Sequence, residues 1–294
     1  MRRLRSRAMD DRRLIFVSGK GGVGKSAVTA ALARRAARRG EHVLAIGMVE
    51  SLGLAAHFGV DALEYEPHQV HTGIDAVAIN RTKALDEYLR LQLHLPRAAP
   101  VGQASKVFQV FVDVAPGVRE IISMGKPIFE TWQGHYDKVI VDSPPLGQLF
   151  SYLRAPATIA QTVPTGAVQD QALRMRDTLG DPTISALVMV TLAEELPVME
   201  TAEALDDLAT EPVIDLAALV VNRVLAPLGI ESSAVASLPP SPQRDAALLH
   251  DNLTTDQQPW LEMLPSGPRL PYLFGFLTPG EVAARLVDHL EEIL

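Results

Sequence analysis

The segment IFVSGKGGVGKSAVTAALA, Ile15 to Ala33, restricts the fold of this chain more than any other stretch. Residues 19–26 read G-K-G-G-V-G-K-S and fit the phosphate-loop pattern G-x-x-x-x-G-K-[ST], with an apolar run before and an alanine-rich run after. Such a loop needs a strand before it and a helix after it, because its backbone N–H groups turn inward at a helix N-terminus that favours anions. The pattern predicts a strand, a loop and a helix that hold phosphate groups.

Each position of this loop has an expected role. Lys25 is expected to bridge the β- and γ-phosphates of a nucleotide, and Ser26 to give its hydroxyl to Mg²⁺. One lysine–phosphate pair at about 4 Å is worth roughly 4 kcal/mol before desolvation, at an effective dielectric constant near 20, so Lys25 is expected to be the most sensitive position. The other expected nucleotide-binding positions of the loop are Gly21, Gly22, Val23, Gly24 and Ala27.

Six short runs are almost entirely apolar and are typical of strands that are covered on both faces. They are residues 14–18, 42–46, 74–79, 138–142, 186–191 and 216–221. The stretches between them are long enough for crossover helices. This alternation predicts an α/β fold: a doubly wound, mainly parallel sheet flanked by helices.

The organisation expected from these patterns is one domain over residues 14–294 after a disordered basic tail at residues 1–13. A helical insertion is expected at about residues 82–136, and an insertion of loop and short helices at about residues 226–269. Near the C-terminus, Thr278 and Glu281 have capping-box spacing. An apolar stripe with helical spacing follows them: Val282, Leu286, Leu290 and Ile293.

Composition excludes several classes of function. The net charge of −8 and the aromatic share of 5% argue against nucleic acid as a partner. The chain has no cysteine, which excludes disulfides, thiolate zinc sites and Fe–S clusters. No apolar stretch is long enough to span a membrane, and the basic start lacks the apolar segment of a secretory signal. We therefore expect a cytoplasmic protein with at most peripheral membrane contact.

A second lysine in the loop, Lys20, gives the form K-G-G-x-G-K-[ST]. This form resembles the deviant Walker A motif of P-loop NTPases of the SIMIBI type, which include MinD-type ATPases, nitrogenase iron protein, the arsenite-pump ATPase and the tail-anchored protein targeting factor. In that family the extra lysine reaches across a dimer interface to the partner's phosphates. The resemblance implies ATP or ADP with Mg²⁺, and a dimer with a paralogous subunit or with itself. The alternative is that Lys20 is a solvent-exposed loop lysine.

Three further stretches resemble the arsenite-pump and tail-anchored-targeting branch. One is residues 187–208, a strand and loop followed by a run with Glu195, Glu200 and Thr201. Residues 142–147, DSPPLG, are similar to its switch II loop, which implies that Asp142 holds an Mg²⁺-bound water and takes part in catalysis together with Lys20 and Lys25. In LVVNRV, residues 219–224, the resemblance implies that Asn222 hydrogen-bonds the adenine, which suits an amide because it both donates and accepts. Pro271 in PYLFGFL is the looser candidate for the adenine pocket.

The branch also carries features that this chain lacks. Its switch I loop reads Asp-Pro-Ala-His-Ser, whereas Met48 and Val49 stand where Asp-Pro is expected, and Glu50 is the nearest acid. Because a missing base typically costs 10² to 10⁴ in rate, about 3–5 kcal/mol of barrier, we expect tight nucleotide binding and slow hydrolysis unless Glu50 substitutes. Without cysteine, the branch's metalloid and zinc sites are not expected.

Several readings of the whole chain are open. Residues 111–130 resemble a stretch in actinobacterial members that occur as pairs of different ATPases. Arg119 and Lys126 therefore serve a partner's nucleotide or the interface, or are only surface charge on the insertion helices. The preferred reading is a dimeric ATPase whose nucleotide state changes the shape of the dimer, as one half of a heterodimer, with a protein client as a possible further partner. The alternative is a non-hydrolysing, nucleotide-bound scaffold. A MinD- or ParA-like positioning ATPase is less favoured, because the terminal helix ends in the acidic VDHLEEIL.

Overall fold

The computed structural model of the chain describes residues 9–48, 51–92 and 117–293. Eight strands form one sheet in the order β3-β4-β2-β5-β1-β6-β7-β8, and all neighbouring strands are parallel except β3 and β4. The strands are β1 (Leu14–Gly19), β2 (Val43–Gly47), β3 (His68–His71), β4 (Ile74–Ala78), β5 (Lys138–Asp142), β6 (Ser185–Leu192), β7 (Leu216–Val224) and β8 (Arg269–Pro271).

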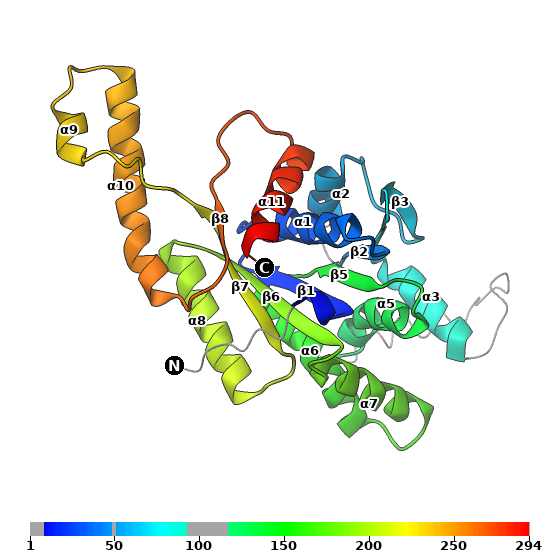
Figure 1. The fold of residues 1–294 in the computed structure, drawn as a ribbon. Coiled ribbons are helices and arrows are strands. Elements are labelled where there is room, and N and C mark those ends of the chain that lie inside the picture. Colours follow the sequence, from blue (N-terminus) through cyan, green and yellow to red (C-terminus); the bar gives the residue numbers. More distant parts are fainter. Residues whose placement is uncertain (1–8, 49–50, 93–116, 294) are drawn as a thin grey trace.

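Helices cover both faces of this sheet (Figure 1). They are η1 (Met9–Asp11), α1 (Lys25–Arg38), α2 (Ser51–Phe58), α3 (Arg81–Gln92), α5 (Val118–Gln133), α6 (Leu146–Thr162), α7 (Ala167–Gly180), α8 (Glu195–Thr210), α9 (Ser232–Ala236), α10 (Pro242–Met263) and α11 (Pro279–Ile293). One core layer joins α1, α2 and α11 to the sheet, and the other joins α5, α6, α7 and α8 to its opposite face. The predicted doubly wound α/β fold is confirmed.

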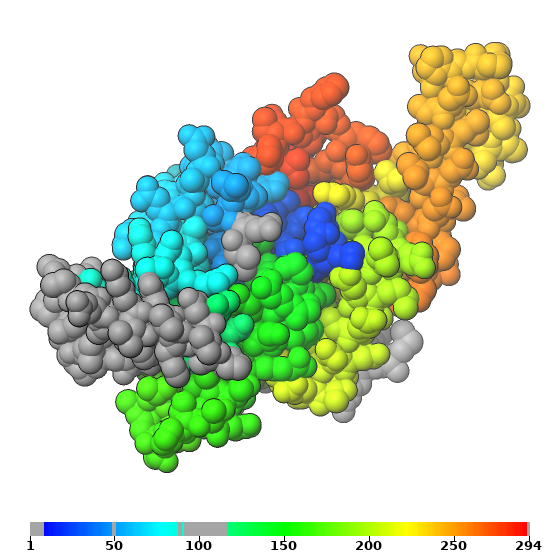
Figure 2. All heavy atoms as spheres, turned by 180° about the vertical axis from the view of Figure 1, so that it is seen from behind, coloured from blue at the N-terminus to red at the C-terminus, as the bar shows by residue number. Residues whose placement is uncertain are grey.

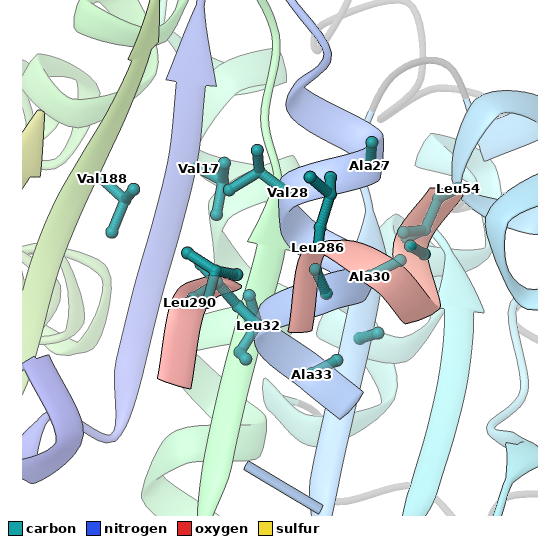
Figure 3. Close-up of a cluster of buried hydrophobic side chains, with 14 of the residues drawn as sticks. Val17, Ala27, Val28, Ala30, Leu32, Ala33, Leu54, Val188, Leu286 and Leu290 are labelled. Carbon is teal, nitrogen blue, oxygen red and sulfur yellow. The ribbon is translucent and has the colours of Figure 1, made fainter. Parts of the chain in front are cut away.

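The C-terminal helix α11 packs on α1, the helix that follows the phosphate loop. Leu286 and Leu290 of α11 are buried and lie beside Leu32 of α1 in the same apolar cluster (Figure 3). The predicted capping box is present, because the Thr278 backbone N–H donates to Glu281 Oε2 at 2.8 Å and the Glu281 N–H donates to Thr278 Oγ1 at 3.3 Å. Among the described residues, no helix combines the length and the apolar character that a membrane span requires.

The expected disordered tail of residues 1–13 is wrong for its last part. Met9–Asp11 forms η1 with Met9 buried, and the Arg12 side chain is 2% exposed and pairs with Asp215 at 2.8 Å. The basic composition of residues 1–13 did not predict these contacts. Burial of Arg12 depends on its ion pair with Asp215, which lies far away in the sequence. Residues 1–8 lie outside the described residues.

The two expected insertions also need correction. Within 82–136, the second helix, α5, packs on the sheet through Met124 and Ile128, so it belongs to the crossover between parallel β4 and β5 rather than to an addition. Residues 93–116 lie outside the described part. Within 226–269, the expected short helices are α9 and the 22-residue α10, in which Pro259 lies inside the helix instead of ending it.

Candidate functional site

The predicted strand, loop and helix are present at residues 14–38. The loop lies so close to the sheet that only glycine fits at position 19. A side chain there would place its Cβ 2.0 Å from the carbonyl oxygen of Val190 in β6. Gly22 and Gly24 have φ values of +86° and +96°, which L-residues with side chains rarely adopt. These three glycines are therefore required by the backbone path of the loop itself.

The two lysines of the loop lie differently. Lys25 folds back over the loop, and its Nζ donates to the carbonyl oxygen of Lys20 at 3.2 Å. The Lys20 ammonium instead forms an ion pair with Glu200 of α8, and its side chain is 30% exposed. Lys20 therefore does not match the alternative of a lysine directed only into solvent. Glu200 lies in a run that resembles the branch, but the resemblance did not pair it with Lys20. The pairing follows from the topology, because α8 follows β6, the neighbour of β1, and so begins at the same edge of the sheet.

Ser26 and Asp142, the two residues expected to hold Mg²⁺ directly or through a bound water, are brought together. Ser26 Oγ donates to Asp142 Oδ2 at 2.6 Å. Asp142 is 6% exposed at the carboxyl end of β5, which pairs with β1 in parallel, so the strand order explains the meeting. Oxygen donors of this kind are the ligands that Mg²⁺ prefers, so the residues fit that ion. Among the described residues, no group of three or more His, Cys, Asp or Glu side chains could hold a metal ion by itself.

Asn222 lies beneath the phosphate loop at the end of β7. Its Nδ2 donates to the carbonyl oxygen of Val23 at 2.9 Å, and its Oδ1 accepts from the backbone N–H of Arg223 at 3.0 Å. In this arrangement both ends of the amide are bonded within the chain, and the side chain supports the loop. Pro271 ends the neighbouring strand β8 and pairs with Val224 of β7, so it lies at the same edge of the sheet.

The region expected to act as switch I is only partly described. Met48 is buried, whereas Val49 and Glu50 lie outside the described residues. Helix α2 follows, and a Cβ at Gly53 would lie 3.0 Å from Ser26 Oγ, so the start of α2 lies over the candidate metal ligand. No motif in the sequence marks Gly53. At the other end of α2, burial lowers the pKa of His57, whose Nδ1 is 2.7 Å from the carbonyl oxygen of Pro279.

Lys126 lies inside the protein and is not available to a partner. Its side chain is 6% exposed and pairs with Glu130 at 2.9 Å and Glu87 at 3.3 Å. Burial alone would lower the pKa of Lys126, but the hydrogen bonds and charges of these two carboxylates outweigh burial and raise it. The suggestion that Lys126 reaches a partner's nucleotide is therefore wrong. Arg119 stands at the start of the same helix, α5, and is exposed.

The sequence of the chain matches the profile of a known protein family. The sequence profile of the anion-transporting ATPases matches residues 12–166 and 165–235. The ATPase BagA of Mycobacterium tuberculosis is 32% identical over 223 residues, which cover 72% of this chain and 65% of BagA, just under two thirds of its length. The ATPase GET3 of Chaetomium globosum is 24% identical over 254 residues, which cover 73% of this chain and 74% of GET3.

The glycines of the loop allow a graded test of its geometry. Gly21 has neither a positive φ nor a neighbour near its Cβ position, Gly22 has only the positive φ, and Gly24 has both, with Asn222 Nδ2 at 2.4 Å. We expect the free energy of unfolding to be almost unchanged in Gly21→Ala, to fall by about 1 kcal/mol in Gly22→Ala, and to fall further in Gly24→Ala. Denaturant unfolding measures the three values, and any other order would contradict the described loop.

Proposed function

Since this chain belongs to the anion-transporting ATPase family, we propose that it binds ATP and ADP with Mg²⁺ at the phosphate loop and uses the nucleotide to change the shape of a dimer. The observation that carries this proposal is the meeting of three groups at one edge of the sheet. Lys25 lies over the loop, and Ser26 and Asp142 meet beside it at 2.6 Å. This arrangement places a cation and two oxygen ligands where a helix N-terminus favours phosphate.

Each residue has a proposed part in holding the nucleotide. Lys25 neutralises the β- and γ-phosphates, and the N–H groups of the loop surround the β-phosphate. Ser26 and Asp142 hold Mg²⁺, which supplies charge neutralisation of the phosphates when it is bound. Asn222 and Pro271 border the adenine from the ends of β7 and β8. Because the Asn222 amide is bonded to Val23 in this structure, a contact with adenine requires the amide to rotate.

We further propose that hydrolysis of the phosphoanhydride is slow. Met48 is buried and apolar at the position where an aspartate would orient the attacking water. Glu50 is the nearest acid in the sequence and is the one candidate to replace it. Tight binding combined with slow hydrolysis suits a protein that signals through its nucleotide-bound state.

The ion pair of Lys20 supports a role in a dimer. In this single chain Glu200 neutralises the Lys20 ammonium. We propose that the phosphates of a second subunit, either a paralogue or another copy, compete for Lys20 and draw it away from Glu200. Dimer formation would then move the start of α8 as well, and a cytoplasmic protein client would respond to that change.

Two alternatives remain distinct from this proposal. A nucleotide-locked scaffold would use the same phosphate site without any change of state. A positioning ATPase of the MinD or ParA kind needs a terminal helix that is free to bind a membrane. Here the apolar residues Leu286 and Leu290 of α11 are buried against the protein's own core, which disfavours that alternative.

The nucleotide site is tested by calorimetry with Mg·ATP and Mg·ADP. The unaltered protein should bind both, and Lys25→Ala should bind at least about tenfold more weakly, because it removes a charge pair with the phosphates. Lys83→Ala is the control, since Lys83 is an exposed residue of α3 and has no part in the site. Absence of heat with either nucleotide, or equal affinity in Lys25→Ala, would contradict the proposal.

The hydrolysis rate separates slow ATPase from scaffold. Single-turnover hydrolysis should be slower than in a relative with the switch I aspartate by about 10² to 10⁴, the usual effect of a missing base. If Glu50 takes the place of the missing aspartate, Glu50→Ala should lower the hydrolysis rate further. If the unaltered protein hydrolyses ATP as fast as such a relative, and Glu50→Ala is equally fast, the proposal of slow hydrolysis is wrong.

The role of Lys20 is tested by sedimentation with and without Mg·ATP. Lys20→Ala should abolish the nucleotide-dependent change in association, while Glu200→Gln should shift it to lower protein concentration, because the competing carboxylate is gone. Glu203→Gln, an exposed change one turn further along α8, is the control. A protein that retains nucleotide but shows no change of association, alone or with a paralogue, would instead be a scaffold.

A further inference from the structure

The segment between β7 and β8 forms an arm that stands away from the body of the protein (Figure 2). We use the word arm for residues 225–264, which include α9 and α10. Large apolar side chains are exposed here: Leu249, Leu253 and Met263 of α10 are 60%, 47% and 58% exposed. Single exposed apolar residues are ordinary, but a group on one projecting helix indicates a binding surface.

These side chains share one face of α10. Leu249, Leu253, Asp256, Trp260 and Met263 follow each other at intervals of four, three, four and three residues, the spacing of a seam between two packed helices. At 3.6 residues per turn, the five positions fall within a narrow arc. We call this set the α10 stripe. It resembles one half of a helix pair whose other half is not part of the described chain.

The neighbouring face of α10 is already occupied by the protein itself. Thr254 and Leu261 are buried, and Gln257 Oε1 accepts from the backbone N–H of Leu225 at 2.9 Å. His250 Nε2 is 2.8 Å from the carbonyl oxygen of Ala226. These contacts fix the rotation of α10 about its axis and leave four members of the α10 stripe exposed, namely Leu249, Leu253, Asp256 and Met263. The fifth member, Trp260, is partly buried and packs against the protein's own apolar cluster at Leu261.

Aromatic side chains lie beside α10 on the side of His250. The ring of Phe274, from the segment between β8 and α11, lies beside the ring of His250 with centroids 5.8 Å apart. Tyr272 lies 4.8 Å from Phe274 by the same measure. His250 lies about 100° around α10 from Leu249, so these exposed rings lie on the side of the helix that the protein itself occupies and are not part of the α10 stripe.

The charges of α10 indicate what kind of helix fits. The helix carries four acidic residues and a single arginine. Asp256 lies within the α10 stripe and Asp245 lies on the same face, one turn before Leu249, and among the described residues neither has an ion-pair partner. Two copies of this helix would bring like charges together in the seam, whereas a basic helix would neutralise them.

We propose that the α10 stripe binds an amphipathic helix of a different protein, with apolar residues at heptad spacing and lysine or arginine opposite Asp245 and Asp256. This surface goes beyond the ATPase function, and none of its residues belongs to the proposed nucleotide site. A second copy of this chain is the occupant that the charges disfavour. The expected partner is therefore recognised by two features together, an apolar seam and positive charge at its edges.

The test uses the full-length protein and a labelled four-heptad helical peptide with leucine at the seam positions and lysine beside them. A second peptide has glutamate in place of each lysine. In fluorescence anisotropy, the lysine peptide should bind with saturation, and the glutamate peptide at least about tenfold more weakly. Leu253→Asn should weaken the lysine peptide about tenfold, because a buried leucine contributes about 1.5–3 kcal/mol. Val168→Asn on α7 is the matched control, since Val168 is also 47% exposed.

Charge reversal gives the second arm of the test. Asp256→Lys should bind the glutamate peptide more tightly than the lysine peptide. This result tests the proposal even if Leu253→Asn fails to fold. Equal binding of both peptides, no binding, or an affinity that Leu253→Asn leaves unchanged would each overturn the proposal. Self-association of the unaltered protein that Leu253→Asn abolishes would show instead that a second copy is the occupant.

Discussion

The whole site depends on how closely the phosphate loop approaches the sheet behind it. A side chain at Gly19 would collide with the carbonyl oxygen of Val190. A side chain at Gly24 would collide with the amide nitrogen of Asn222. Both neighbours come from strands made more than a hundred and fifty residues later. The loop therefore has its required shape only when β6 and β7 are in place, and the binding geometry is a property of the whole sheet.

The sequence was sufficient for the features that local chemistry determines. The phosphate loop, the capping box and the alternating strands all follow from short-range patterns with one physical solution each. The order of strands then explains why Ser26 and Asp142 meet, although 116 residues separate them. A parallel sheet gathers the carboxyl ends of its strands at one edge, so residues after different strands become neighbours.

Features that arise from contacts between distant segments were not predictable in the same way. The burial of Arg12 requires Asp215, the ion pair of Lys20 requires Glu200, and the ion pair of Lys126 with Glu87 joins α5 to α3. Each of these pairings joins residues far apart in the chain, and no periodic pattern marks them. Helix α5 was mistaken for part of an insertion for a related reason, since its proline and glycine residues obscured an ordinary crossover helix.

The central position of β1 has a consequence for synthesis on the ribosome. Among the described strands β1 comes first in the chain, yet both its neighbours, β5 and β6, are translated much later, as the pairing of Leu14 with Val139 and Ser185 shows. Until then a nascent chain exposes an apolar strand edge that ribosome-associated chaperones are suited to shield. Such delayed, long-range pairing also favours slow maturation, so expression yield should respond to translation speed before β6.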